Sequence, residues 1–181
     1  MKLRKFKYLF YRKVWAKFHP VQYAKKIGVN CLGDLHIYGN IDWSTEPWII
    51  TLGNNVHLTD GIKFITHDGG TLLFRKFVPD LEITKPIIVG DDVYIGNNVI
   101  ILPGVKIGNK VVVGAGSIVS KDIPDNSLVV GVPAKVIKTA DEYFAKIQRE
   151  SIHLGHLKGE EKDKEIMKYY NYKGGSNGIY F

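Results

Sequence analysis

The sequence predicts an all-β solenoid, in which short strands wind into stacked three-sided coils. One observation is a residue, mostly aliphatic, that recurs every six positions: Ile87, Val93, Val99, Val105, Val111, Ser117, Ile123 and Val129. Another is a second aliphatic residue two positions after most of these, followed by a small residue and often by Asn or Asp. Residues two apart in a strand share one face, and Gly, Asn and Asp tolerate the backbone of a sharp corner. Six residues therefore make one side and one corner, whereas a helix needs spacings of three and four.

The same pattern begins earlier in the chain but is less regular. Ile50, Val56 and Ile62 keep the six-residue phase, and the segment around Pro47 and Trp48 breaks it. We therefore expect residues 27–67 to form the first coils, with imperfect regularity. Stacked coils of about eighteen residues each would bury one column of aliphatic side chains.

The repeat is interrupted between Thr66 and Pro86. Residues 67–86 are predicted to form a loop extruded from the coils, and loops on rigid scaffolds often carry function. The alternative is a surface insertion without a role.

Helices are expected at both ends of a β-helix domain that spans residues 27–137. Residues 1–26 are basic and aromatic and are predicted to be helical, with no signal peptide and no transmembrane stretch. Residues 138–181 are predicted to form a helical extension and a tail. There, Thr139 and Glu142 make a capping-box pattern before a helix at 140–149, and a second helix covers about 160–170.

Charge and cysteine content restrict the partners. The formal net charge is +7, which suits nucleic acid, an anionic membrane or a phosphorylated cofactor. We expect no nucleic-acid partner because no recognition module accompanies the charge. The segment Lys2–Phe18 is expected either to contact the inner face of a membrane or to cap the coils. Cys31 is the only cysteine, which fits a reducing cytoplasm, and we interpret it as a small buried apolar residue.

Several segments of the repeat resemble the hexapeptide-repeat acetyltransferases, with galactoside, maltose, xenobiotic and capsular-polysaccharide acetyltransferases as the nearest branches. The matching segments are Ile95-Gly96-Asn97, Pro103 to Gly108, Gly114 to Pro124, and Gly131 to Ile137. The resemblance implies a left-handed parallel β-helix, a homotrimer, and acetyl-CoA bound between neighbouring subunits. It also implies direct transfer of the acetyl group to a saccharide hydroxyl, which suggests a role in surface polysaccharide biosynthesis.

By this resemblance, His67 is the general base, because the family's catalytic histidine similarly precedes a loop rich in Gly or Pro. Neutral imidazole is a suitable proton acceptor near neutral pH. The second ring nitrogen needs a partner that fixes the tautomer. Asp60, Asp68, Glu82 and a backbone carbonyl are all open to this role, and we favour Asp60.

The resemblance also assigns cofactor contacts by position. Asn97 and Ala115 match backbone contacts to the pantetheine arm, and Ser120 and Lys121 match the pair near the nucleotide. Lys135 and Lys138 match cations near the phosphates, although Lys at the last position cannot bind phosphate in the bidentate manner of Arg. The alternative interpretation of the small residues is that they only form the corners of the coils. The alternative interpretation of the lysines is that they are solvated surface residues.

The acceptor site is the least defined part of the prediction. We assign His57 and Arg75 to acceptor binding, with Trp43, Trp48 and Phe74 as aromatic candidates. No metal is expected: His153 and His156 lack further ligands, and His36, His57 and His67 have the wrong spacing for a zinc hydro-lyase. The alternative reaction is N-acetylation of an amino sugar, nucleotide-sugar or antibiotic. The alternative to an enzyme is a non-catalytic scaffold protein.

Overall fold

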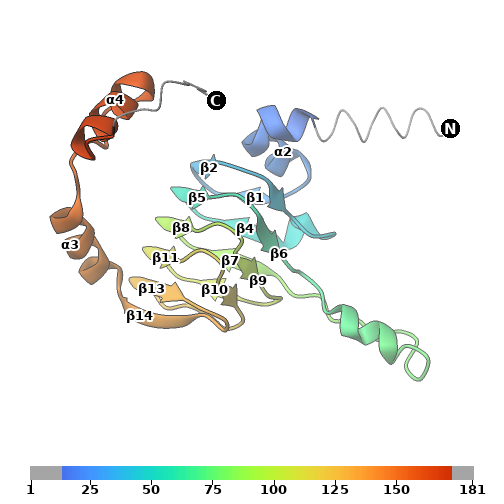
Figure 1. The fold of residues 1–181 in the computed structure, drawn as a ribbon. Helices are drawn as coiled ribbons and strands as arrows, with labels where there is room; N and C mark the ends of the chain where they lie inside the picture. Colours follow the sequence, from blue (N-terminus) through green and yellow to red (C-terminus); the bar gives the residue numbers. More distant parts are fainter. Residues whose placement is uncertain (1–13, 173–181) are drawn as a thin grey trace. The chain divides into compact units, whose positions relative to one another are not determined.

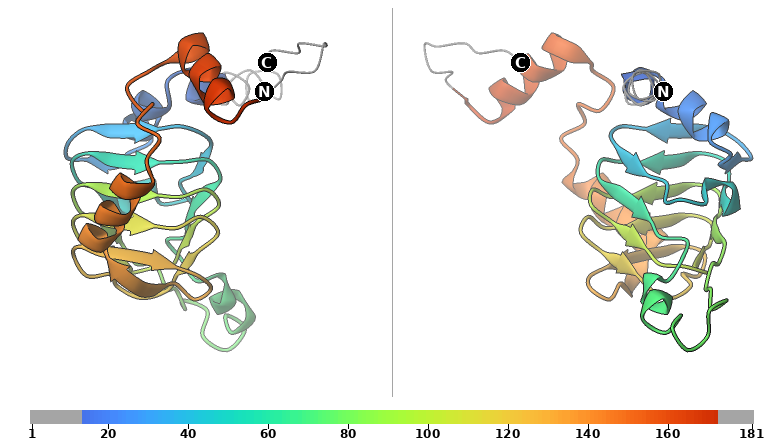
Figure 2. Two further views of the ribbon diagram at one scale, coloured as in Figure 1. Left: turned by 60° about the vertical axis from the view of Figure 1, so that its left-hand side comes forward. Right: turned by 90° about the vertical axis from the view of Figure 1, so that its right-hand side faces the viewer.

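The computed structural model of the protein describes residues 14–172. It contains two compact units, which divide between Tyr143 and Phe144. The first unit is a stack of coils that begins at its N-terminal strands and ends at a β-hairpin (Figures 1 and 2). The predicted solenoid is therefore confirmed.

Three sheets form the three flat sides of the coils, and their strands pair in parallel except for the last pair of sheet B. Sheet A contains β1 (Asn30–Cys31), β4 (Ile50–Leu52), β7 (Ile87–Val89) and β10 (Lys106–Ile107). Sheet B contains β2 (Leu35–Ile37), β5 (Val56–Leu58), β8 (Val93–Ile95), β11 (Val111–Val113), β13 (Ser127–Val130) and β14 (Lys135–Thr139). Sheet C contains β3 (Ile41–Asp42), β6 (Ile62–Phe64), β9 (Ile100–Ile101) and β12 (Ile118–Val119).

The spacing of hydrogen-bonded residues in adjacent coils shows where the repeat is regular. Asp91 and Asn109 bond at a separation of 18 residues, as expected for a regular coil. The separation is 21 residues between Asn30 and Thr51 and 37 between Asn54 and Asp91. Extra residues are thus inserted in two neighbouring coils without disturbing the pairing of the strands.

The core is a single column of inward aliphatic side chains. Within the strands burial alternates, as in β5, β6, β7 and β8, where the first and third residues are buried. The largest wholly buried residue, Phe64, stacks on Trp43 with 5.2 Å between ring centroids. Full burial of each such side chain contributes about 1.5–3 kcal/mol relative to exposure.

The corner between sheets A and B explains why Asn or Asp follows a small residue. Asn54 Oδ1 accepts a hydrogen bond from the backbone N–H of Asp34 at 2.9 Å. The same bond recurs from coil to coil, with Asp91, Asn109 and Asp125 accepting from the backbone N–H of Asn54, Asp91 and Asn109. Gly108, which precedes Asn109, has no room for a side chain, because a Cβ there would lie 2.2 Å from Asp125 Oδ1.

One helix covers the N-terminal end of the first unit, and two further helices follow its last strand. Helix α2 (Pro20–Lys26) buries Ala24 in the core above the first coil. Helix α3 (Ala140–Glu150) follows β14 and begins with the predicted capping box, because Thr139 Oγ1 accepts from the N–H of Glu142 at 3.1 Å. Helix α4 (Gly159–Tyr169) matches the second predicted helix.

Two expectations fall partly or wholly outside this description. The basic segment is described only from residue 14, where residues 14–18 are helical. The predicted tail beyond Tyr172 lies outside the described residues. Within residues 14–172, no helix is both long and apolar enough to cross a membrane.

Candidate active site

The two inserted segments lie at the same corner, one coil apart. Residues 43–49 follow β3 and include the short 3₁₀ helix Pro47–Ile49, and the loop of residues 67–86 follows β6. The two segments contact each other directly, since Thr45 Oγ1 lies 3.3 Å from His67 Nδ1. The irregular parts of the repeat thereby form one continuous surface.

His67 stands at the base of the extruded loop. It forms an isolated antiparallel bridge with Thr84, and Asp68 N–H donates to the carbonyl of Ile83 at 2.9 Å. The loop continues through the 3₁₀ helix Gly69–Leu73 and extends away from the coils (Figure 1). Its base is therefore held by the backbone, while the His67 side chain remains 39% exposed.

Glu46 is the hydrogen-bond partner of His67. Its Oε2 lies 3.0 Å from His67 Nδ1 and accepts a hydrogen bond from the buried Thr66 hydroxyl at 2.5 Å. Its Oε1 accepts from the Thr45 hydroxyl at 2.6 Å. Hydrogen bonds from Thr45 and Thr66, with a smaller contribution from His67, lower the pKa of Glu46 to about 2.

These contacts fix the protonation of the imidazole. An ionised carboxylate only accepts hydrogen bonds, so the proton of neutral His67 must be on Nδ1. The lone pair is then on Nε2, which makes no hydrogen bond within residues 14–172. His67 is therefore arranged to accept a proton from a bound molecule.

The favoured partner, Asp60, was a wrong prediction. Asp60 Oδ1 accepts from the backbone N–H of Asn40 at 2.6 Å, at the corner between sheets B and C. Asp68 binds the N–H of Gly70, and Glu82 pairs with Arg75. The sequence missed Glu46 because it lies in the segment that breaks the six-residue phase, where the facing coil cannot be deduced.

A pocket of about 500 Å³ opens beside His67. It is lined by Ile65, His67, Asp68, Gly69, Ile83, Lys85, Leu102, Pro103 and Ser120. The structure thus brings the predicted base and one predicted cofactor residue, Ser120, into the same pocket. Lys121 follows directly in sequence and is exposed.

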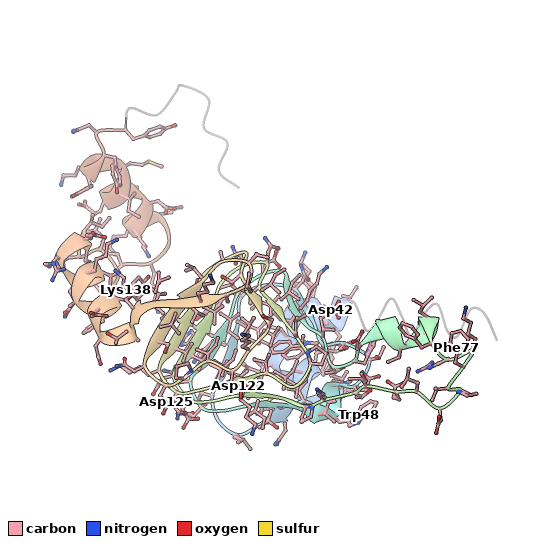
Figure 3. All side chains as sticks on the ribbon, turned by 90° about the horizontal axis from the view of Figure 1, so that it is seen from below. Asp42, Trp48, Phe77, Asp122, Asp125 and Lys138 are labelled. Carbon is pink, nitrogen blue, oxygen red and sulfur yellow. The ribbon has the colours of Figure 1, made fainter. Side chains whose placement is uncertain are left out.

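The other predicted cofactor residues lie elsewhere in the unit. Asn97 and Ala115 stack at the corner between sheets B and C, where Gly116 N–H donates to the carbonyl of Asn97 at 2.8 Å. Both residues precede strands of sheet C, whereas His67 follows the sheet C strand β6 and so lies at the other corner of that sheet. Lys135 and Lys138 lie on β14, and Lys138 is far from the extruded loop with Phe77 (Figure 3).

The residues predicted to bind the acceptor are not beside His67 in the same chain. His57 points outward from sheet B, where Tyr38 Oη lies 2.8 Å from its Nδ1 and Asn55 Oδ1 lies 2.9 Å from its Nε2. Arg75 is used within the loop, where its Nε donates to the carbonyl of Leu81 at 3.0 Å and its guanidinium pairs with Glu82. Trp48, in contrast, is 63% exposed at the same corner as His67.

A second hollow, of about 740 Å³, is lined by the residues on either side of Glu46 in the chain, Thr45 and Pro47. Its lining includes the outward residues Asp42 and Lys63, the aromatic Trp43 and Trp48, and Thr45. Lys63 and Ile65 are two apart on the outer face of sheet C, and they line the second hollow and the His67 pocket respectively. The segment that carries Glu46 therefore borders the second hollow, while His67 lines the first.

Comparison with known proteins identifies the family. The family described as "Bacterial transferase hexapeptide (six repeats)" matches residues 86–121. Protein CapG of Staphylococcus aureus is 47% identical over 149 residues, which cover 81% of this chain and 86% of CapG. The chain belongs to the hexapeptide-repeat transferases. Other curated relatives are longer, and the chain covers 43% and 60% of two of them.

Solved structures agree with this assignment to the hexapeptide-repeat transferases. A maltose O-acetyltransferase from Clostridium difficile 630 has a TM-score of 0.51 and 31% identity, covering 65% of this chain and 73% of that protein. A galactoside acetyltransferase in complex with coenzyme A also has a TM-score of 0.51, with 27% identity, covering 77% of this chain and 76% of that protein. The fold is the left-handed parallel β-helix of the family, and the chain is an acyltransferase.

Proposed function

We propose that the protein is an acetyl-CoA-dependent O-acetyltransferase that acts on a saccharide hydroxyl. The observation that carries this proposal is His67, held by an ionised Glu46, at the edge of a pocket shared with Ser120. The relatives support the reaction class, because a galactoside O-acetyltransferase and a maltose O-acetyltransferase are among them, although N-acetyltransferases are found there too.

The residues support direct transfer. His67 Nε2 takes the proton of the acceptor hydroxyl while the hydroxyl oxygen attacks the thioester carbonyl. The tetrahedral intermediate carries its negative charge on the former carbonyl oxygen, which backbone N–H groups stabilise. Collapse breaks the carbon–sulfur bond, and the proton on His67 passes to the departing thiolate. Glu46 stabilises the imidazolium that exists between these two proton transfers.

The cofactor would lie along sheet C and extend from the His67 pocket towards Lys135 and Lys138, the two lysines predicted to contact its phosphates. Leu102 and Pro103 give the pocket an apolar side suited to the pantetheine arm, and Ser120 and Lys121 lie next along the corner. In the same chain, however, Asn97 and Ala115 are at the other end of sheet C. A second copy that presents this other corner to His67 would complete the site.

The outer face of sheet C supports a homotrimer. Its outward residues Ile65, Ile100, Leu102 and Ile118 are only half-buried in the single chain. Packing of these apolar side chains against neighbouring copies would remove them from water. A closed three-fold ring repeats one contact three times and forms three equivalent sites.

The acceptor would occupy the larger hollow beside Glu46. The exposed face of Trp48 suits the apolar face of a sugar ring, and Thr45, Asp42 and Lys63 supply polar groups. This location leaves His57 and Arg75 with no direct role in the same chain. A sugar unit of a surface polysaccharide is the acceptor that we favour.

We place the protein in the cytoplasm, where acetyl-CoA is made. The unpaired Cys31 fits this location and is half-buried, with its Sγ donating to the carbonyl of Val29 at 3.6 Å. Contact of the N-terminal basic segment with the inner membrane surface stays a prediction, since most of that segment lies outside the described residues.

The proposal is tested by thiol release from acetyl-CoA with a panel of sugars, amino sugars and nucleotide-sugars. We expect acceptor-dependent release by the wild type and a loss of about 10²- to 10⁴-fold in His67→Ala, because general base catalysis is worth that much. His156→Ala, an exposed histidine in the C-terminal unit, is the matched control.

The outcomes of this assay separate the alternatives. Acetylation only of amino groups, identified by mass spectrometry of the product, would replace O-acetylation by N-acetylation. Full activity in His67→Ala would exclude His67 as the base. Failure to bind acetyl-CoA would overturn the enzymatic assignment.

A further inference from the structure

We infer that Glu46 is a positioning residue, which fixes the tautomer and orientation of His67 for proton transfer. The inference rests on the proposed function of His67 and adds a residue that no sequence pattern indicated. Its first support is direct contact, with 3.0 Å between Glu46 Oε2 and His67 Nδ1. A carboxylate on one imidazole nitrogen orients the ring and directs the other nitrogen toward the reacting group.

The second support is that Glu46 is itself held in place. Three donors surround its two oxygens: the Thr45 hydroxyl on Oε1, and the Thr66 hydroxyl and His67 Nδ1 on Oε2. Thr66 is wholly buried, so its hydroxyl has a fixed direction. The carboxylate therefore has little freedom to rotate away from His67.

The third support is the local backbone, which presents Glu46 to the next coil. Ser44 adopts a left-handed conformation with φ 60°, and its N–H donates to Asp42 Oδ1 at 3.0 Å. Pro47 then begins a short 3₁₀ helix. The chain turns outward and back within a few residues, which places the Glu46 side chain opposite Thr66 and His67 in the following coil.

The fourth support is that the acids nearest in sequence to His67 are used elsewhere. Asp68 Oδ1 binds the N–H of Gly70 at 2.9 Å, and Glu82 pairs with Arg75. Among residues 14–172, Glu46 is the carboxylate within hydrogen-bond distance of the His67 ring. The role thus falls to a residue 21 positions before the histidine.

The test uses Glu46→Gln in the full-length protein, since glutamine keeps the size of the side chain and removes the charge. We expect kcat to fall by about 10- to 100-fold, the usual effect of losing such a supporting contact, with KM for acetyl-CoA unchanged. Glu161→Gln, an exposed acid on α4, is the control for the loss of one negative charge.

A spectroscopic measurement separates positioning from a general structural effect. Nitrogen-15 NMR of the neutral ring, assigned by the signal lost in His67→Ala, should show the Nδ1–H tautomer in the wild type. In Glu46→Gln we expect a mixture with the Nε2–H tautomer, while the circular dichroism spectrum and melting temperature stay close to the wild type.

The two proposals fail in different ways. An unchanged tautomer with kcat within about two-fold of the wild type would overturn the role of Glu46, whatever the acceptor. A changed tautomer in a protein that transfers acetyl to no acceptor would support the positioning contact and overturn the proposed function.

Discussion

His57 and its neighbours form an unusual cluster on the outer face of sheet B. The ring stacks on His36 with 4.3 Å between centroids, and both of its nitrogens have partners, Tyr38 Oη and Asn55 Oδ1. Asn55 in turn donates to Asp92 at 2.7 Å. Burial, and then the charge of His36, lower the pKa of His57 below its usual 6.5.

This lowered pKa predicts a loss of stability on acidification. Between the ordinary pKa and the lowered pKa the unfolded chain binds a proton at His57 that the folded protein does not, so the free energy of unfolding falls as pH falls through this range. We expect a decrease between about pH 7.5 and pH 5.5, in urea titrations, that is smaller in His57→Gln. An equal decrease in both proteins would show that other groups cause it.

At the scale of residues, the sequence was most informative where the repeat was regular or a family motif covered it. His67 and Ser120 were both selected from sequence, and the structure places them in one pocket. Glu46 was not selected, because its relation to His67 depends on three extra residues in the first coil. The prediction of Asp60 rests on its place one coil side before His67, but its carboxylate is used at a corner.

Among the structural elements, the corner between β8 and β9 leaves no room for a side chain at Gly96. A Cβ there would lie 2.6 Å from the backbone nitrogen of Ala115 and 3.0 Å from its Cα. These neighbours are backbone atoms of the next coil, and Gly96 N–H bonds to the carbonyl of Val113 at 2.8 Å. The coils cannot separate at this point without losing ladder hydrogen bonds.

Gly96→Ala should therefore destabilise the protein by about 1–3 kcal/mol, as expected for overpacking. The free energy of unfolding by urea measures the change. Gly69→Ala is the matched control, because a Cβ at Gly69 would have no neighbour within 4 Å. Equal stabilities of the two variants would mean that the corner has more freedom than these distances indicate.

The six-residue period predicts the parallel strands. Capping and charge patterns predict both of the described C-terminal helices, α3 and α4. The antiparallel strand β14 did not follow, because its residues are mostly exposed and lack the inward alternation. The 3₁₀ helices in the two irregular segments were also missed. Their short turns depend on contacts with the neighbouring coil rather than on local pattern.

For the whole molecule, the separation of His67 from Asn97 and Ala115 has a direct test. If each site joins His67 of one copy to Ala115 of the next, two inactive variants should complement each other. We expect co-expressed His67→Ala and Ala115→Trp chains to recover about a quarter of wild-type activity, since random mixing restores that share of the interfaces. Each variant expressed alone should remain inactive.

The controls are the mass of the assembly and the behaviour of separately purified variants. Light scattering should give three copies for the wild type and for both variants. No recovery in mixed assemblies of the correct mass would show that one chain supplies the whole site.

The inserted segments also bear on how such a protein can diversify. Ile50 still pairs with Ile87 across the whole extruded loop, just as Ile88 pairs with Lys106 across a regular coil. Doubling the length of a flexible loop costs only about 0.6 kcal/mol. Insertions and deletions at this corner can therefore accumulate beside His67 while the strands of the coils keep their register. Descendants of one ancestor can in this way exchange acceptors and retain the same acetyl donor.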